Sequence, residues 1–256
     1  MSATAETTNT EPDTWDPYKY ALVELDGNGS ELAQLRNLAP ACNCELRPGP
    51  GGELWLGSDE FDDAEPDQAR EKAIKLLKTL NGLARLDNYD HRPVKVGGEF
   101  LKKSRQLHSY GEPKRLQRTE MEQYFGPPWV DPFGPIRETE ATRRAARIAN
   151  DPSLIDVVHP LADEVSWQKL RVAFERITAL VGRTPKNTDA LINNGYCTRE
   201  QRDTFKANVE DPRYSGDDAV HGVHHGGPLK GKPMTEKEGF NFIVHLLNGH
   251  LSKHPN

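Results

Sequence analysis

One amphipathic stretch in the second half of this chain constrains its fold more than any other feature. Between Asp163 and Gly182, apolar residues advance by three, four, three and four positions, at Trp167, Leu170, Phe174, Ile177 and Val181. This spacing puts all five on one face of an α-helix. Because such a helix gains most of its stability from packing of its apolar face, other elements must cover it. The stretch predicts a helix over 163–182 inside a larger helical assembly.

Further helices are predicted on both sides of this stretch. Thr198-Arg-Glu-Gln201 and Thr235-Glu-Lys-Glu238 both have the capping-box pattern, so a helix is expected to begin at each. Residues 138–149 and 187–193 also have helical patterns. The final helix carries apolar residues on one face, at Phe240, Ile243, Val244, Leu247 and Leu251. Residues 138–256 are therefore expected to form an all-α, up-and-down helical bundle.

The first part of the chain has a different pattern, in which short strand signals alternate with turns and helices. The run Pro48-Gly-Pro-Gly-Gly52 is turn chemistry and joins two strand candidates into a predicted hairpin. Residues 18–104 are thus expected to be a small α+β domain. The expected elements are strand 20–25, helix 31–39, hairpin strands 44–47 and 53–56, a long helix beginning near Pro66, and strand 93–97.

Two segments lack regular patterns. Residues 1–17 are rich in Thr and Glu and are expected to be a disordered leader, without the basic and apolar regions of a signal peptide. Residues 105–137 are expected to be a connector, because four prolines between Gly126 and Pro135 remove backbone donors and fix φ. The predicted fold class is therefore an α+β N-terminal domain (18–104), a connector, and a helical bundle (138–256).

Composition limits the function classes. The sequence has 35% hydrophobic residues and a mean hydropathy of -0.76. It contains no apolar run of about 18 residues, so no membrane-spanning helix is expected. Three cysteines, an odd number, do not form a disulfide framework and favour a reduced compartment, the cytoplasm. The net charge of -6 argues against a general polyanion binder and leaves only local basic patches.

One constellation carries candidate chemistry. Arg213, Asp217 and His221 are each four residues apart, so on a helix they would form a ladder on one face. An Asp beside a His orients the ring and raises its pKa, and an Arg offers a forked phosphate-binding group. In a catalytic interpretation, His221 is the general acid/base for attack by an RNA 2′-hydroxyl, Arg213 stabilises phosphate charge and Asp217 orients the ring.

A structural interpretation of the same residues is also open. Acidic residues in a first helical turn often only complement the helix dipole, and an Arg–Asp pair at a four-residue spacing is common on surfaces. Gly216 weakens a continuous helix from Arg213. Two single residues were also weighed. Cys197 is expected to be buried, and Glu175, off the apolar stripe, is expected to face either the 213–221 segment or solvent.

The motifs of the C-terminal part resemble the HEPN (higher eukaryotes and prokaryotes nucleotide-binding) superfamily. The resemblance covers about 163–254: the Trp167–Ile177 stripe, a capped helix, the run Arg213-Tyr-Ser-Gly-Asp-Asp-Ala-Val-His221, and the capped final helix after Met234. It is most similar to the branch with an Arg-x-x-Gly-Asn-x-Ala-x-His signature. Asp217 stands where that branch has Asn.

The resemblance implies an all-α domain, often a homodimer, associated with RNA or nucleotides, metal-independent RNA cleavage, toxin–antitoxin systems and phage defence. His221 fills the His position, whereas the usual Arg position of RNA-cleaving members falls near Gly216, downstream of Arg213. An alternative is a non-catalytic module that dimerises or docks a protein partner. A third hypothesis, a metal-dependent hydrolase, would use His221, His224 and His225, but their spacing matches no structural metal site. No cofactor is expected.

Overall fold

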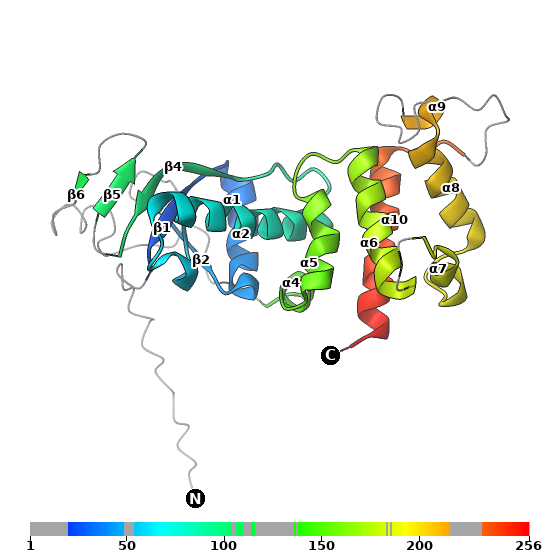
Figure 1. The fold of residues 1–256 in the computed structure, drawn as a ribbon, viewed down its shortest axis with the longest axis horizontal. Helices are drawn as coiled ribbons and strands as arrows, with labels where there is room; N and C mark the ends of the chain where they lie inside the picture. The colour runs from blue at the N-terminus through cyan, green and yellow to red at the C-terminus, as the bar shows by residue number, and fades with distance from the viewer. Residues whose placement is uncertain are drawn as a thin grey trace, which may run out of the picture.

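The computed structural model describes residues 20–48, 54–103, 106–109, 114–115, 136, 138–182, 184, 186–215 and 232–255. An antiparallel sheet lies at one end of the molecule and a group of helices at the other, with α2 (Pro66–Asp87) and α5 (Pro152–Val158) between them (Figure 1). An α+β region followed by a helical part is therefore confirmed. The leader 1–17 lies outside the described residues.

In the described residues the sheet has six strands in the order β2-β3-β1-β4-β5-β6, and every neighbouring pair is antiparallel. The predicted hairpin is confirmed, since Leu46 of β2 pairs with Leu56 of β3. The last two strands fall within 105–137, the segment expected to be a connector, so the sheet extends past residue 104. The strands are β1 (Leu22–Asp26), β2 (Glu45–Pro48), β3 (Leu54–Gly57), β4 (Lys95–Leu101), β5 (Gln106–Ser109) and β6 (Lys114–Arg115).

Two helices cover this sheet region. Helix α1 (Gly29–Leu38) contacts α2, and α2 packs against β4. Pro66 occupies the first turn of α2, where its missing N–H is not needed, so the predicted helix start is confirmed. Ala69, Ala73, Leu77 and Leu80 give α2 its buried face.

Helix α2 also joins the sheet region to the helical part. A Cβ at Gly82 would lie 2.6 Å from the backbone oxygen of Val158 in α5, so only glycine permits this approach. The buried side chains form one continuous cluster that runs from β1 through α2 and α5 to the last helix. The domain boundaries remain a prediction, but the two parts share a core.

The first helices of the C-terminal part begin at side-chain caps. Helix α4 (Glu140–Ala149), predicted at 138–149, opens with a capping box between Thr139 and Thr142. Helix α5 was not predicted. It is only seven residues long and starts where the Asp151 side chain accepts a hydrogen bond from the backbone N–H of Ser153.

The long amphipathic helix is confirmed as α6 (Trp167–Gly182), four residues shorter at its start than predicted. The Ser166 hydroxyl accepts a hydrogen bond from the Lys169 N–H at 3.4 Å, which satisfies a donor of the first turn and begins the helix there. Trp167, Leu170, Phe174 and Ile177 are buried, whereas Val181 in the last turn is half-buried.

Further helices of this part, within the described residues, are α7 (Asp189–Asn193), α8 (Arg199–Glu210), the short α9 (Pro212–Ser215) and α10 (Glu236–Lys253). The two capping boxes at Thr198 and Thr235 are both formed, as predicted. Helix α8 runs along α6 in the opposite direction. Helix α10 then runs back beside α6, so the chain follows an up-and-down path (Figure 1). Among the described residues, no helix is long and apolar enough to cross a membrane.

Candidate functional site

The predicted catalytic residues are placed only in part. Arg213 lies in the four-residue helix α9 (Pro212–Ser215), directly after α8. Asp217 and His221 lie outside the described residues, as do Gly216, His224 and His225. The ladder among Arg213, Asp217 and His221 therefore stays a prediction.

The Arg213 side chain is engaged by a neighbour that the ladder hypothesis did not include. Its Nε donates to Asp211 Oδ1 at 2.9 Å and Oδ2 at 3.1 Å, and its Nη2 lies 2.5 Å from Oδ2. The hydrogen bond to Asp211 raises the pKa of Arg213, so the guanidinium stays charged. A phosphate approaching Arg213 would have to compete with this carboxylate.

Helix α8 holds the chain on both sides of the segment that contains the predicted site. Asn208, which is fully buried, donates from Nδ2 to the Lys232 carbonyl and accepts the Met234 N–H at Oδ1, each at 2.8 Å. The chain therefore leaves α8 at α9 and comes back to it at Lys232. The sequence signal for Asn208 was an amide on the same helical face as Phe205 and Val209.

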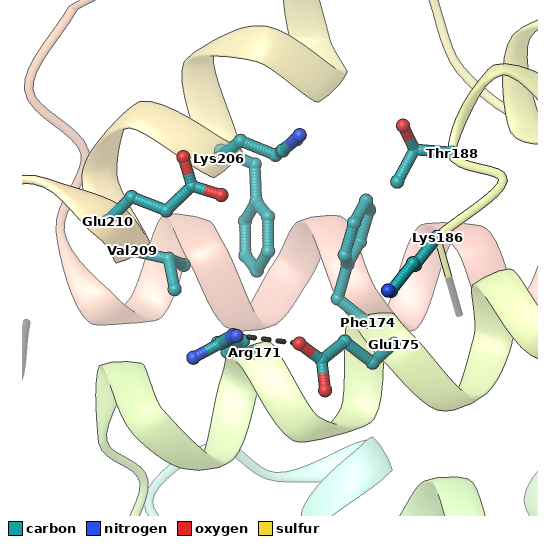
Figure 2. Close-up of a pocket in the computed structure, with 9 residues that line it drawn as sticks. Arg171, Phe174, Glu175, Lys186, Thr188, Lys206, Val209 and Glu210 are labelled. Atoms are coloured by element: carbon teal, nitrogen blue, oxygen red, sulfur yellow. Dashed lines mark hydrogen bonds and ion pairs between the residues drawn. The ribbon is translucent and has the colours of Figure 1, made fainter. Parts of the chain in front are cut away.

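A pocket of about 220 Å³ opens between α6 and α8, and Glu210, the last residue of α8, is part of its lining. Its floor is apolar and consists of Phe205 together with Phe174 and Val209, which are labelled in Figure 2. The phenyl rings of Phe174 and Phe205 are 5.0 Å apart, and Phe242 of α10 packs 5.2 Å from Phe205. Because these rings are buried in mutual contact, the floor is fixed by the core.

The chain between α6 and α7 forms the third wall. A Cβ on Gly182 would lie 2.8 Å from the Asn187 carbonyl oxygen, so glycine lets the chain fold back closely where α6 ends. This return puts Lys186 and Thr188 on the rim of the pocket. Thr188 precedes α7 without capping it through its side chain, so its hydroxyl is not used by the helix start.

The rim is rich in charge. Arg171 donates from Nε to Glu175 Oε1 at 2.8 Å, an i,i+4 pair on α6. Within the described part of the chain, Lys186, Lys206 and Glu210 form no ion pair. Lys186 and Thr188 lie at one end of the pocket and Glu210 at the other, with Lys206 between them (Figure 2). The rim thus carries three cationic groups and two carboxylates.

The structure shows where Glu175 lies, which was expected to face either the 213–221 segment or solvent. Its carboxylate lines this pocket, whose far end is Glu210, three residues before Arg213. Sequence reasoning missed the lysines, because Lys186 lies outside any helix and Lys206 appeared to be an ordinary exposed residue. Only the antiparallel packing of α6 and α8 brings them together.

A second pocket, of about 430 Å³, lies between α8 and α10. Its apolar lining is Pro233, Met234 and Phe242, and its carboxylates are Glu200 and Glu238. Glu238 is used by the Thr235 capping box, because its Oε2 accepts the Thr235 N–H at 2.7 Å. This pocket has fewer groups left for a ligand than the pocket between α6 and α8.

The cysteines do not suit nucleophilic chemistry. All three are free thiols, and Cys197 is buried as predicted. Burial raises the pKa of Cys197 and raises that of Cys42 to about 12, so neither is a thiolate near neutral pH.

Metal ligation is equally unsupported where side chains are described. No group of three or more His, Cys, Asp or Glu side chains that could hold a metal ion occurs among the described residues. Of the C-terminal histidines, His245 Nε2 lies 3.1 Å from the Tyr196 carbonyl oxygen, and His250 packs on His254 with ring centroids 4.6 Å apart. The histidines of 221–225 lie outside the described residues, so the metal hypothesis rests on sequence alone.

Comparison with known proteins adds no family. No protein-family model, no curated protein and no solved structure matches the chain. The resemblance to HEPN domains therefore remains a prediction from the motifs.

Proposed function

We propose that the helical part is a HEPN-like module that binds RNA or a nucleotide, and that the pocket between α6 and α8 receives one nucleotide. The single observation that supports this most is the combination of a phenyl floor with two lysines that lack ion pairs in the described part of the chain. Cationic side chains neutralise phosphates, and the rings, which are 4% exposed at Phe174 and 1% at Phe205, give the pocket an apolar floor without presenting a face for stacking. The overall charge of -6 fits a local site better than a broad nucleic-acid surface.

The size of the pocket supports one nucleotide rather than a large ligand. Its volume of about 220 Å³ is below the roughly 300–1,000 Å³ of ordinary ligand pockets. A single base with its phosphate needs less enclosure than a dinucleotide cofactor, since the rest of an RNA strand stays in solvent. Lys186 and Lys206 are well separated from each other along the chain and approach the same opening, which suits a phosphate at the rim.

The test is the affinity of the full chain for a labelled, single-stranded RNA at low salt. We expect Lys186→Ala combined with Lys206→Ala to weaken binding by about tenfold or more, since charged hydrogen bonds contribute roughly 1.5–3 kcal/mol each. Lys75→Ala combined with Lys78→Ala is the matched control, because both of these lysines are exposed on α2, away from the pocket. Equal weakening by both double variants would contradict the assignment of the site.

Cleavage is a further part of the proposal, in which His221 is the general acid/base and Arg213 and Asp217 assist it. Its support is that α9 with Arg213 directly follows Glu210 of the pocket rim. Cleavage that persists in EDTA and disappears in His221→Ala would support a ribonuclease. Binding without cleavage in either protein would leave a non-catalytic RNA-binding module.

The competing hypothesis is a module that only dimerises or docks a protein. It predicts that RNA affinity is negligible at low salt and that the pocket lysines do not alter it. The oligomeric state of the pocket variants separates the two hypotheses further. A change of oligomeric state in Lys186→Ala combined with Lys206→Ala would favour docking.

A further inference from the structure

Two residues of α6, Arg171 and Glu175, form an ion pair on the rim of the α6–α8 pocket. Arg171 donates from Nε to Glu175 Oε1 at 2.8 Å, and both side chains line the pocket (Figure 2). The contact uses only one of the nitrogens of the guanidinium. Among the described residues, the two Nη nitrogens of Arg171 make no hydrogen bond and no ion pair, so their N–H groups are left for another partner.

This pair contributes little to the stability of α6. The two side chains are 36% and 39% exposed, and an ion pair with that much access to water is screened and weak. On a helix, an i,i+4 pair stabilises best when the acidic residue precedes the basic one, and here the order is the reverse. Neither residue lies at an end of α6, so neither caps the helix or complements its dipole there.

The effect of the pair on the Arg171 side chain is larger. A free arginine side chain loses rotamer freedom when it binds a ligand, and a contact that holds it beforehand reduces this cost. Because the guanidinium is planar, a partner at Nε also fixes the direction of the Nη donors. Such a fork can bind two oxygens of one phosphate, whereas a lysine ammonium acts as a point charge without this geometry.

We propose that Arg171 is a phosphate-binding residue of the pocket beside Lys186 and Lys206, and that Glu175 is its positioning residue. This inference rests on the proposed nucleotide-binding function and adds to it a directional phosphate contact. It gives the two carboxylates of the rim different roles. Glu175 orients Arg171, whereas Glu210, which has no ion pair among the described residues, contributes only its negative charge.

The test compares Gln and Ala at each carboxylate, with the full chain and a labelled, single-stranded RNA at low salt. Both substitutions remove the charge, but only Gln keeps an oxygen that can accept the Arg171 Nε–H. We expect Glu175→Gln to bind about 2- to 10-fold more tightly than Glu175→Ala, which corresponds to the cost of ordering one long side chain. Glu210→Gln and Glu210→Ala, the matched control, should bind equally.

The role of Arg171 is tested in the same assay. We expect Arg171→Ala to weaken binding by about tenfold, since it removes a charged hydrogen-bond donor, and to make the salt slope shallower by about 0.7. In the Arg171→Ala background, Gln and Ala at position 175 should bind equally, because the group that Glu175 orients is gone. A difference that persists there would mean that Gln contacts the RNA itself and would overturn the positioning role.

The remaining outcomes separate this inference from the proposed function. Equal binding by Glu175→Gln and Glu175→Ala, or an unchanged affinity and salt slope in Arg171→Ala, would overturn the inference and leave binding by the lysines intact. Absence of RNA binding by the original protein would overturn the proposed function itself. Circular dichroism of each variant distinguishes lost recognition from lost folding.

Discussion

Two polar clusters in this molecule are built in opposite ways, one inside the α+β region and one at the α6–α8 pocket. In the first, His91 is 1% exposed and its two ring nitrogens each lie 3.1 Å from an amide oxygen, of Gln34 in α1 and of Asn81 in α2. In the second, Lys186, Lys206 and Glu210 reach the rim of an open pocket without ion pairs in the described part of the chain. In the first cluster the polar groups bond to one another, whereas in the second the charged groups remain accessible to a ligand.

The amides around His91 are fixed by further hydrogen bonds. Gln34 Nε2 donates to the Ala84 carbonyl at 2.7 Å, and Asn81 Nδ2 donates to the Val94 carbonyl at 2.8 Å. Both amide oxygens must therefore point at the ring. This closed arrangement joins α1, α2 and the chain before β4, and it serves folding. The comparison teaches that convergence of polar groups indicates a site only when those groups are accessible and not already used.

The largest change in stability is expected from Asn81→Ala, in the His91 cluster. The change leaves the Val94 N–H, the Val94 carbonyl and one His91 nitrogen without their partner in a buried place. We expect it to lower the free energy of unfolding by about 3–5 kcal/mol, since each buried polar group left without a hydrogen-bond partner costs roughly 1–3 kcal/mol. Urea denaturation measures this loss. A loss below about 1 kcal/mol would mean that the cluster is not structural.

The next effect is a pH dependence from His91. Burial, and then the charge of Arg85, lower the pKa of His91 to about 4, although Glu31 opposes the shift. The unfolded chain, with a pKa near 6.5, binds this proton more readily, so stability is fully present above pH 6.5 and falls as the pH drops towards 4. We expect a loss of about 3 kcal/mol over this window.

The matched variant is His91→Gln, which has no ionisable group at this position. Its unfolding free energy should change less between pH 6.5 and 4 than that of the original protein. The two amide oxygens beside the ring favour the protonated form, which opposes the effect of burial. Stability that rises as the pH falls through this window would show that the amide oxygens outweigh burial in setting the pKa of His91. The ring would then be protonated in the folded protein.

A smaller effect is expected from Gly82→Ala, at the contact that joins the two parts. The new Cβ would lie 2.6 Å from the Val158 carbonyl oxygen, so α2 and α5 must move apart. Overpacking of this kind costs about 1–3 kcal/mol. Thermal unfolding measures the loss. If the two parts fold independently, the sheet region and the helical part should then melt in separate transitions, whereas a shared core predicts one transition.

The smallest effect on stability is expected at the pocket. Lys186→Ala combined with Lys206→Ala removes no ion pair in the described part of the chain, so the free energy of unfolding should change by less than about 0.5 kcal/mol. Urea denaturation checks this value. A large loss of stability would place these lysines with the His91 cluster, as structural residues.

How much of the fold could be predicted from the sequence depended on how far apart along the chain the interacting residues are. The boxes at Thr198 and Thr235 were predicted and formed, because capping involves residues only three apart. The position of β1 between β3 and β4 was not predictable in the same way, because it depends on pairings far apart in the chain. Helix α5 was missed because a seven-residue helix gives little periodicity.

The candidate site shows the same limit. The ladder hypothesis considered spacings of four from Arg213 and overlooked Asp211, two residues away, which holds the guanidinium. The phenyl floor was visible as apolar stripes on two helices, but Phe174 and Phe205 are far apart in sequence. The sequence alone does not predict that Lys186 reaches the same pocket, because the position of Lys186 depends on the turn at Gly182.

The most direct test of the central claim, that the pocket lysines meet a phosphate-bearing strand, is the salt dependence of RNA binding. For single strands, the slope of the logarithm of the binding constant against that of the salt concentration falls by about 0.7 for each lost phosphate contact. We predict a slope shallower by about 1.4 in Lys186→Ala combined with Lys206→Ala, and an unchanged slope in Lys75→Ala combined with Lys78→Ala. An unchanged slope in the pocket variant, or an equal change in both, would contradict the account.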